Sequence, residues 1–168
     1  MKLSRTALTL AAAVCLAALG TPASAAPHPA SGSASDTHCV VVVDPLEPGQ
    51  EVSEVASRTC FTGKDAASRA DASVASTTAS VELMTWATDH SYGGEYTHVY
   101  GSAYCDGAGY SFRPNSWWSS RLSSYLVSGG CNKSYASGPR GNGTFDGDVP
   151  YVGAALNDAV TSIKIWRG

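Results

Sequence analysis

The C-terminal half of this chain, residues 81–168, alternates short strand-like runs with glycine turns and contains no long apolar stripe of helical period. Runs rich in β-branched and aromatic residues predict strands, and glycine clusters between them predict turns. All 4 Trp and all 8 Tyr fall in this half, which supplies large apolar areas for a core. The spacing predicts an all-β fold, a Greek-key β-sandwich rather than an α/β domain. The expected strands are 81–86, 95–100, 110–113, 121–127, 131–136, 143–146 and 161–167.

The N-terminal residues 1–25 have the pattern of a secretory signal peptide. Lys2 and Arg5 begin it, an apolar run covers 7–19, and Ala-Ser-Ala ends it at 25. The run is shorter than the roughly 20 residues of a membrane span, and no later segment approaches that length. We therefore expect a secreted protein without a membrane-spanning segment. Cys15 inside the run leaves a lipid-anchored form as an alternative.

The mature chain is acidic. Removal of Lys2 and Arg5 with the signal peptide changes the formal net charge from −3 to −5. Nucleic acids and anionic membranes are recognised through basic patches, so this balance argues against both classes of partner.

Four cysteines remain in the mature chain, and an exported protein meets an oxidising environment. Four cysteines allow three pairings. We favour Cys39–Cys60 with Cys105–Cys131, because each bond then closes a loop within one region of the sequence. Such loops stabilise a fold by about 3 kcal/mol each in the chain-entropy model. A metal site built from the four cysteines is the alternative, but no C-x-x-C spacing supports it.

The mature chain divides into four segments. Residues 26–38 are rich in Ala, Ser, Pro and Gly and are expected to form a flexible leader. Residues 39–62 are expected to be a small disulfide-tied appendage with a strand at 40–43 and a short helix at 51–58. Residues 63–80 lack periodic apolar positions and are interpreted as a linker or a weak surface helix. The β domain then covers 81–168.

A cluster of oxygen-bearing side chains precedes the last expected strand. Asn157 and Asp158 are followed by two spacers and then by Thr161 and Ser162. Carboxylate, amide and hydroxyl oxygens on one short loop are what Ca²⁺ prefers. The same frame recurs 38 residues earlier, at 119–124, with serine at each of the equivalent positions. The echo indicates a duplicated unit.

These features resemble the βγ-crystallin superfamily, whose domains pair two Greek-key motifs. The family motif begins with two aromatic residues and a glycine, and ends with a calcium signature of two Asn/Asp, two spacers, Ser/Thr and Ser. Residues 88–94 carry the second aromatic and the glycine as Tyr92 and Gly94, with Trp86 near the first aromatic position. The second motif lacks its second aromatic at 138–143, whereas 157–162 matches the calcium signature in full.

The resemblance implies that each calcium site combines groups from both loops. Asn157, Asp158 and Thr161 are then the candidate ligands of one loop, and the partner loop offers Ser119, Ser120 and Ser123. Serine in place of Asn/Asp removes negative charge, so we expect one of the two sites to be weak or lost. Asx and hydroxyl turns without metal are the competing interpretation.

No catalytic motif stands out, and we expect a protein that is not an enzyme. G-x-S-x-G, H-E-x-x-H and a paired Cys/His nucleophile are all missing from the sequence. Asp146 and Asp148 are interpreted as solvated loop acids. Trp117 and Trp118 could form a carbohydrate platform, but neighbours on a strand face opposite ways, so one of them is expected in the core.

Among exported bacterial relatives, the resemblance implies three functions for a monomeric, non-catalytic protein. The first is inhibition of a secreted metalloproteinase, in which a rigid loop enters the protease cleft; residues 105–109 and 137–143 are the candidate loops. The second is a Ca²⁺-binding structural module of the cell surface or matrix. The third is a killer-toxin-like antifungal protein.

Overall fold

The computed structural model describes residues 36–75 and 81–168. The expected signal peptide at 1–25, nearly all of the expected leader and the end of the expected linker at 76–80 lie outside these residues. Strands dominate the described chain, and none of its helices is long and apolar enough to cross a membrane.

The described residues contain nine strands, two α-helices and one 3₁₀ turn. In chain order these are β1 (Thr37–Val43), β2 (Val55–Thr62), α1 (Ala66–Val74), β3 (Val81–Ala87), η1 (His90–Tyr92), β4 (Tyr96–Gly101), β5 (Tyr110–Phe112), α2 (Ser116–Ser119), β6 (Ser124–Val127), β7 (Lys133–Gly138), β8 (Gly141–Asp146) and β9 (Ser162–Trp166).

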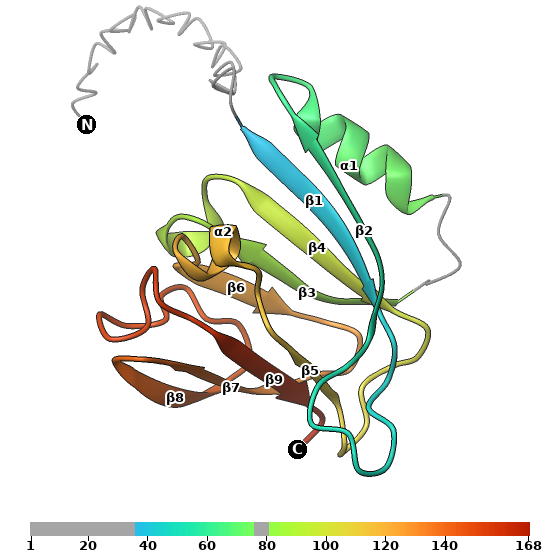
Figure 1. Cartoon of the computed structure of the whole chain (residues 1–168), viewed down its shortest axis with the longest axis vertical. Helices are drawn as coiled ribbons and strands as arrows, with labels where there is room; N and C mark the ends of the chain where they lie inside the picture. The colour runs from blue at the N-terminus through green and yellow to red at the C-terminus, as the bar shows by residue number, and fades with distance from the viewer. Residues whose placement is uncertain (1–35, 76–80) are drawn as a thin grey trace, which may run out of the picture. The chain divides into compact units, whose positions relative to one another are not determined.

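The strands form two sheets (Figure 1). A five-stranded sheet has the order β2-β1-β4-β3-β6, and a four-stranded sheet has the order β5-β9-β7-β8. β3 and β7 occupy similar places in the two sheets: β3 lies between β4 and β6, β7 lies between β8 and β9, and all four pairings are antiparallel. Because β4 and β8 are the hairpin partners of β3 and β7, the local order is the same in both sheets.

The chain passes between the two sheets several times, and two of these crossings are equivalent. After β4 it leaves the five-stranded sheet, and β5 pairs with β9 in the other sheet. After β8 it returns, and Val149 makes an isolated antiparallel bridge to Tyr125 of β6. These equivalent crossings agree with the duplication indicated by residues 119–124 and 157–162.

The core consists of the inward-facing residues of these strands. In β4 and β9 every second residue is buried, which is the period of a strand with one face on the core. Tyr125 crosses the core, where its hydroxyl shares a hydrogen bond of 2.9 Å with Ser134 of β7. Trp86 makes edge-to-face contacts with Phe112 and Trp118 at ring distances of 6.2 and 5.9 Å.

The N-terminal segment differs from the expected appendage. β1 pairs in parallel with β4 and therefore belongs to the five-stranded sheet. Its residues from Cys39 to Val41 are all buried, because α1 contacts β1 and β2 and covers their outer face with the buried Ala66 and Ala70. A strand that is buried on both faces has a continuous apolar sequence, which explains the four consecutive valines.

The short helix expected at 51–58 is wrong, because β2 begins at Val55 and pairs antiparallel with β1. Most of β2 is exposed, so it lacks the alternation that marks a half-buried strand, and its backbone pairing decides its conformation. The segment 63–80 contains α1. The strand expected at 121–127 begins only at Ser124, because α2 precedes it.

The remaining expected strands are present, with boundaries that differ by up to three residues. Both favoured disulfides are also confirmed. Cys39 of β1 bonds Cys60, its direct partner in β2, and Cys105 bonds Cys131. Two disulfides are typical of a protein that works in an oxidising environment outside the cell.

Removal of the first disulfide should weaken the attachment of β2. We expect the double variant Cys39→Ala, Cys60→Ala to lose about 3 kcal/mol of unfolding free energy, because the bond closes a loop with a sequence separation of 21 residues. Urea denaturation measures the loss. Thr59→Ala, on the exposed side of the same strand, should stay within about 0.5 kcal/mol of the wild type. A loss below about 1 kcal/mol in the double variant would contradict the expectation.

Candidate functional site

The two oxygen-rich loops occupy equivalent places in the fold. Residues 119–123 lead into β6, and residues 157–161 lead into β9. The N–H of Ser123 donates to the carbonyl of Ala87 at the end of β3 over 3.0 Å, and the N–H of Thr161 donates to the carbonyl of Ser137 near the end of β7 over 2.8 Å. The sequence echo therefore corresponds to a repeated backbone contact.

The two loops also contact each other. The N–H of Asp158 donates to the carbonyl of Leu122 over 3.2 Å, so groups from both loops lie side by side. The β7–β8 turn packs closely against the second loop, where a Cβ on Gly138 would lie only 2.0 Å from the carbonyl oxygen of Ala159. Glycine is needed at 138 for this approach.

The candidate hydroxyl ligands all donate to backbone carbonyls. Ser120 donates to Trp117 over 3.1 Å, and Ser123 donates to Arg121 over 3.5 Å. Thr161 donates to Ser137 over 3.3 Å. The two serine contacts are local hydroxyl turns of the kind that form without metal, whereas Thr161 reaches across to β7.

Asn157 and Asp158 have a different environment. The amide nitrogen of Asn157 donates to the Asp158 carboxylate over 2.7 Å, while its Oδ1 is buried and has no hydrogen-bond partner. A buried acceptor without a donor is costly and favours a cation at this place. The guanidinium of Arg140 donates to the Asn157 carbonyl and opposes a cation by repulsion. The two loops together supply one carboxylate, so their oxygen ligands fit at most one Ca²⁺ site with little negative charge.

Within residues 36–75 and 81–168, no group of three or more His, Cys, Asp or Glu side chains could hold a metal ion. Asp146 pairs with Lys133, and the Asp148 carboxylate accepts from the N–H of Val127 over 3.0 Å. The two carboxylates serve separate structural contacts. As expected for one member of the pair, Trp118 is buried, and Trp117 packs against the core from the short helix α2, so the two rings do not form a carbohydrate platform.

Residues 102–109 form an exposed loop that we call the tethered loop. At its centre, Tyr104 is 71% exposed, more than any other large apolar side chain of the described chain. The next residue, Cys105, is buried and bonded to Cys131. An apolar ring therefore projects into solvent beside a covalent anchor.

Hydrogen bonds fix the tethered loop on both sides of Tyr104. The carbonyl of Ala103 accepts from the hydroxyl of the core residue Tyr110 over 2.8 Å, and the N–H of Cys105 donates to Gly129 over 2.8 Å. The loop leaves through Gly109, whose φ of +68° and close approach to the Ile165 carbonyl exclude a side chain.

Asp106 completes the loop. Its Oδ1 accepts from the N–H groups of Gly109 over 2.8 Å and Ala108 over 2.9 Å, an Asx turn. These two hydrogen bonds lower the pKa of the Asp106 carboxyl, with Gly109 contributing most. The carbonyl of Asp106 accepts from the N–H of Arg167, just after β9. The tethered loop is thus attached to Tyr110, to the segment 129–131 and to the residue that follows β9.

The second candidate loop, 137–143, is less free to project. Gly138 and Gly141 are paired at the tip of the β7–β8 hairpin, and this tip rests on the loop at 157–161. Of the two candidate loops, only the one at 105–109 lies next to a protruding apolar side chain.

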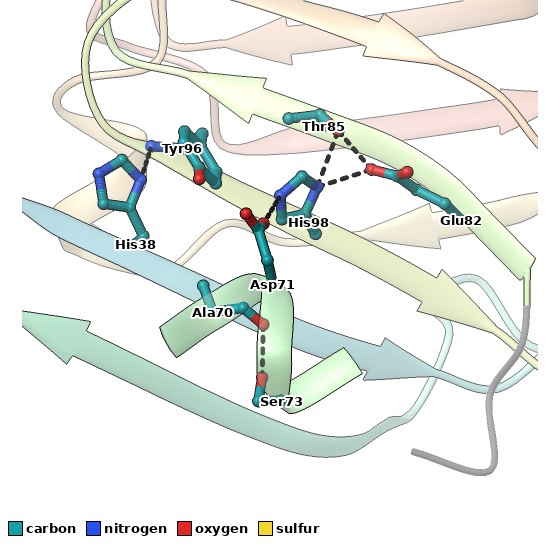
Figure 2. Close-up of polar contacts among 8 residues, drawn as sticks. All are labelled: His38, Ala70, Asp71, Ser73, Glu82, Thr85, Tyr96 and His98. Carbon is teal, nitrogen blue, oxygen red and sulfur yellow. Dashed lines mark hydrogen bonds and ion pairs between the residues drawn. The ribbon is translucent and has the colours of Figure 1, made fainter. Parts of the chain in front are cut away.

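A polar cluster on the five-stranded sheet was not expected from the sequence (Figure 2). His98 of β4 contacts Glu82 of β3 through Nδ1 over 2.6 Å and Asp71 of α1 through Nε2 over 3.5 Å. Thr85 donates to Glu82 over 2.6 Å and lies 3.2 Å from His98 Nδ1. The hydrogen bond from His98 is the largest cause of a lowered pKa at Glu82.

The cluster depends on a β-bulge. The register of β3 shifts between Glu82 and Met84, which lets Glu82 and Thr85 approach the same imidazole although they are three residues apart. Regular strands place such residues on opposite faces. No sequence pattern identifies the bulge, so the contacts of His98 with Glu82 and Thr85 cannot be predicted from the sequence.

His38 of β1 lies beside this cluster. It is buried, its Nδ1 accepts from the N–H of Tyr96 over 3.2 Å, and the two rings are 3.9 Å apart. Burial lowers the pKa of His38, although the carboxylates of Asp36 and Glu95 act in the opposite direction. The fold therefore favours the neutral imidazole.

Comparisons with known proteins leave the family of this chain open. No protein-family model matches the sequence, and no curated protein matches it. A search of solved structures matches a clostrillin double mutant in complex with nickel, with 21% identity and a TM-score of 0.36. The match covers 51% of this chain and 98% of the clostrillin chain. At this TM-score the likeness carries no argument about the present protein.

The environment of His38 predicts a loss of stability on acidification. Because its pKa is lowered by folding, the stability linked to neutral His38 is complete above pH 6.5 and is lost as the pH falls through the lowered pKa. The pKa of Glu82 is also lowered by folding, so a further loss of stability is expected below about pH 4.5. Each proton changes the unfolding free energy by at most about 1.4 kcal/mol per pH unit.

The variant His38→Asn separates the two contributions, since the amide oxygen can accept from Tyr96 without titrating. We expect its unfolding free energy, measured in urea between pH 7.5 and 5.5, to depend less on pH than that of the wild type. Thr59→Ala, at an exposed position without a titratable side chain, should keep the wild-type dependence. Equal pH dependence in wild type and His38→Asn would contradict the role of His38.

Proposed function

We propose that this chain is a secreted, non-catalytic binding protein that inhibits a peptidase by inserting the tethered loop into its cleft. The observation that carries the proposal is the exposure of Tyr104, which is 71% exposed beside the disulfide-bonded Cys105. Large aromatic side chains at such positions dominate protein–protein binding energy when a partner buries them.

The anchoring of the loop supports this role. Hydrogen bonds at Ala103 and Cys105 fix the backbone on either side of Tyr104, so little conformational entropy is lost when a cleft closes around it. Ionised Asp106 holds the following turn. A rigid, preorganised loop of this kind also resists the adjustment that cleavage by a peptidase requires.

The resemblance of the sequence to crystallin-like metalloproteinase inhibitors directs the proposal to metalloproteinases. In support, the repeated strand order in the two sheets and the equivalent contacts of Ser123 and Thr161 are what two crystallin-type Greek-key motifs require. Export and an oxidising compartment agree with a secreted target. The polar cluster at His98 serves contacts among α1, β3 and β4, so we assign it no catalysis.

The inhibitor proposal is tested against a panel of secreted metalloproteinases. We expect stoichiometric inhibition of at least one, with the inhibition constant raised at least about 30-fold in Tyr104→Ala, because interface hot spots contribute about 2 kcal/mol or more. Tyr151→Ala is the matched control, since Tyr151 is a 40% exposed aromatic residue outside the tethered loop. Degradation of the intact protein by every member of the panel, or equal inhibition by Tyr104→Ala, would refute the proposal.

A second candidate function is Ca²⁺ binding between the loops at 119–123 and 157–161. The buried, unpartnered Oδ1 of Asn157 favours it, with the Asp158 carboxylate as the nearby charge. Such a site would hold the two loops together and stabilise the fold, with no part in inhibition.

Thermal unfolding with millimolar CaCl₂ tests this second function. Bound Ca²⁺ should raise the melting temperature, and EDTA should reverse the shift. At a Ca²⁺ concentration one hundred times Kd, binding adds about 2.7 kcal/mol to the free energy of unfolding. Asp158→Asn should remove the shift, because it deletes the charge while tolerating the left-handed φ of 57° at this position. Asp146→Asn is the control. The same melting temperature with CaCl₂ and with EDTA would exclude the site.

A further inference from the structure

The outer face of the four-stranded sheet carries aromatic and basic side chains in two cross-strand rows. Register places Tyr135 of β7 directly between Thr144 of β8 and Lys164 of β9. The neighbouring row places Lys133 between Asp146 and Trp166. We call these six residues the sheet-face patch.

The patch contains a shallow cavity. Its volume is about 370 Å³, and it is lined by Gly107, Tyr135, Thr144, Lys164 and Trp166. This volume lies in the range of small-molecule sites, in which apolar rings surround a few polar groups. Three strands supply the side chains, so backbone pairing fixes the spacing of the rings.

We propose that the sheet-face patch binds an anionic saccharide, with sugar rings on Tyr135 and Trp166 and a uronate carboxylate on Lys164. This function is additional to peptidase inhibition and does not depend on it. The exposed ring of Tyr135 offers a flat apolar surface for the C–H face of a sugar, and its hydroxyl and that of Thr144 offer hydrogen bonds.

The charges of the patch favour an anion. Lys133 forms an ion pair with Asp146, whereas Lys164 has no carboxylate partner among the described residues. The Nζ of Lys164 lies 6.0 Å from the centre of the Trp166 ring, which places the ammonium group at the aromatic surface. The patch thus has one uncompensated positive charge on a chain whose formal net charge is −3.

The strand order favours a saccharide over an extended peptide. Peptides that add to a sheet need an edge strand with free backbone groups. Tyr135, Lys164 and Trp166 belong to β7 and β9, which are hydrogen-bonded on both sides, and only Thr144 and Asp146 lie on the edge strand β8. Recognition on this face therefore uses side chains alone, and aromatic rings with hydroxyl and ammonium groups match the many hydroxyls and carboxylates of an acidic sugar chain.

The test measures binding of three probes to the full mature protein by calorimetry and tryptophan fluorescence. The probes are a galacturonic acid hexamer, a neutral galactose oligomer of the same length, and a glutamate hexapeptide. We expect the uronate to bind best and to change the fluorescence, with this change lost in Trp166→Phe. No binding of the uronate at millimolar concentration would overturn the proposal, and so would equal binding of the glutamate peptide.

Two variants assign the contacts. Lys164→Gln should weaken uronate binding at least tenfold without changing the neutral oligomer, and Tyr135→Ala should weaken both sugars. Lys64→Gln and Tyr151→Ala are matched controls at exposed or partly exposed positions outside the patch. Melting temperatures confirm that each variant is folded. Undiminished uronate binding in Lys164→Gln and Tyr135→Ala would place the site elsewhere and refute the assignment.

Discussion

Burial of three large aromatic side chains between the two sheets is the constraint on which the rest of the structure depends. Trp86, Tyr110 and Tyr125 are among the largest fully buried residues, and they bring large apolar areas into the core of a small β domain. The hydroxyl of Tyr125 bonds Ser134 across the core, and burial raises the pKa of Tyr125 to about 12. A hydrogen-bonded neutral phenol therefore links the sheets.

The same core positions the exposed surfaces. Tyr110 is buried, yet its hydroxyl donates to the carbonyl of Ala103 in the tethered loop, and the disulfide from Cys105 reaches Cys131, two residues before β7. The rigidity proposed for Tyr104 thus originates in the core rather than in the loop. The sheet-face patch depends on the outer side of the same strands whose inner side packs the core.

The tethered loop and the sheet-face patch meet at Gly107, which belongs to the loop and lines the cavity. The two surfaces are therefore adjacent, and a ligand in the cavity would contact one side of the tethered loop. The polar cluster at His98 lies on the other sheet, where it joins α1 to β3 and β4. Its contact through Asp71 links the sheet to α1, the helix that covers β1.

The β class and most strands follow from the sequence, and cysteine spacing favours both observed disulfides, because strand period, glycine turns and cysteine spacing are local signals. The sequence also located the equivalent loops at 119–124 and 157–162. Three features are visible only in the folded protein: β1 and β2 join the sheet, a bulge brings Glu82 and Thr85 to His98, and Tyr104 protrudes. These features depend on pairing between distant segments, and a local pattern carries no information about which strand a backbone will meet.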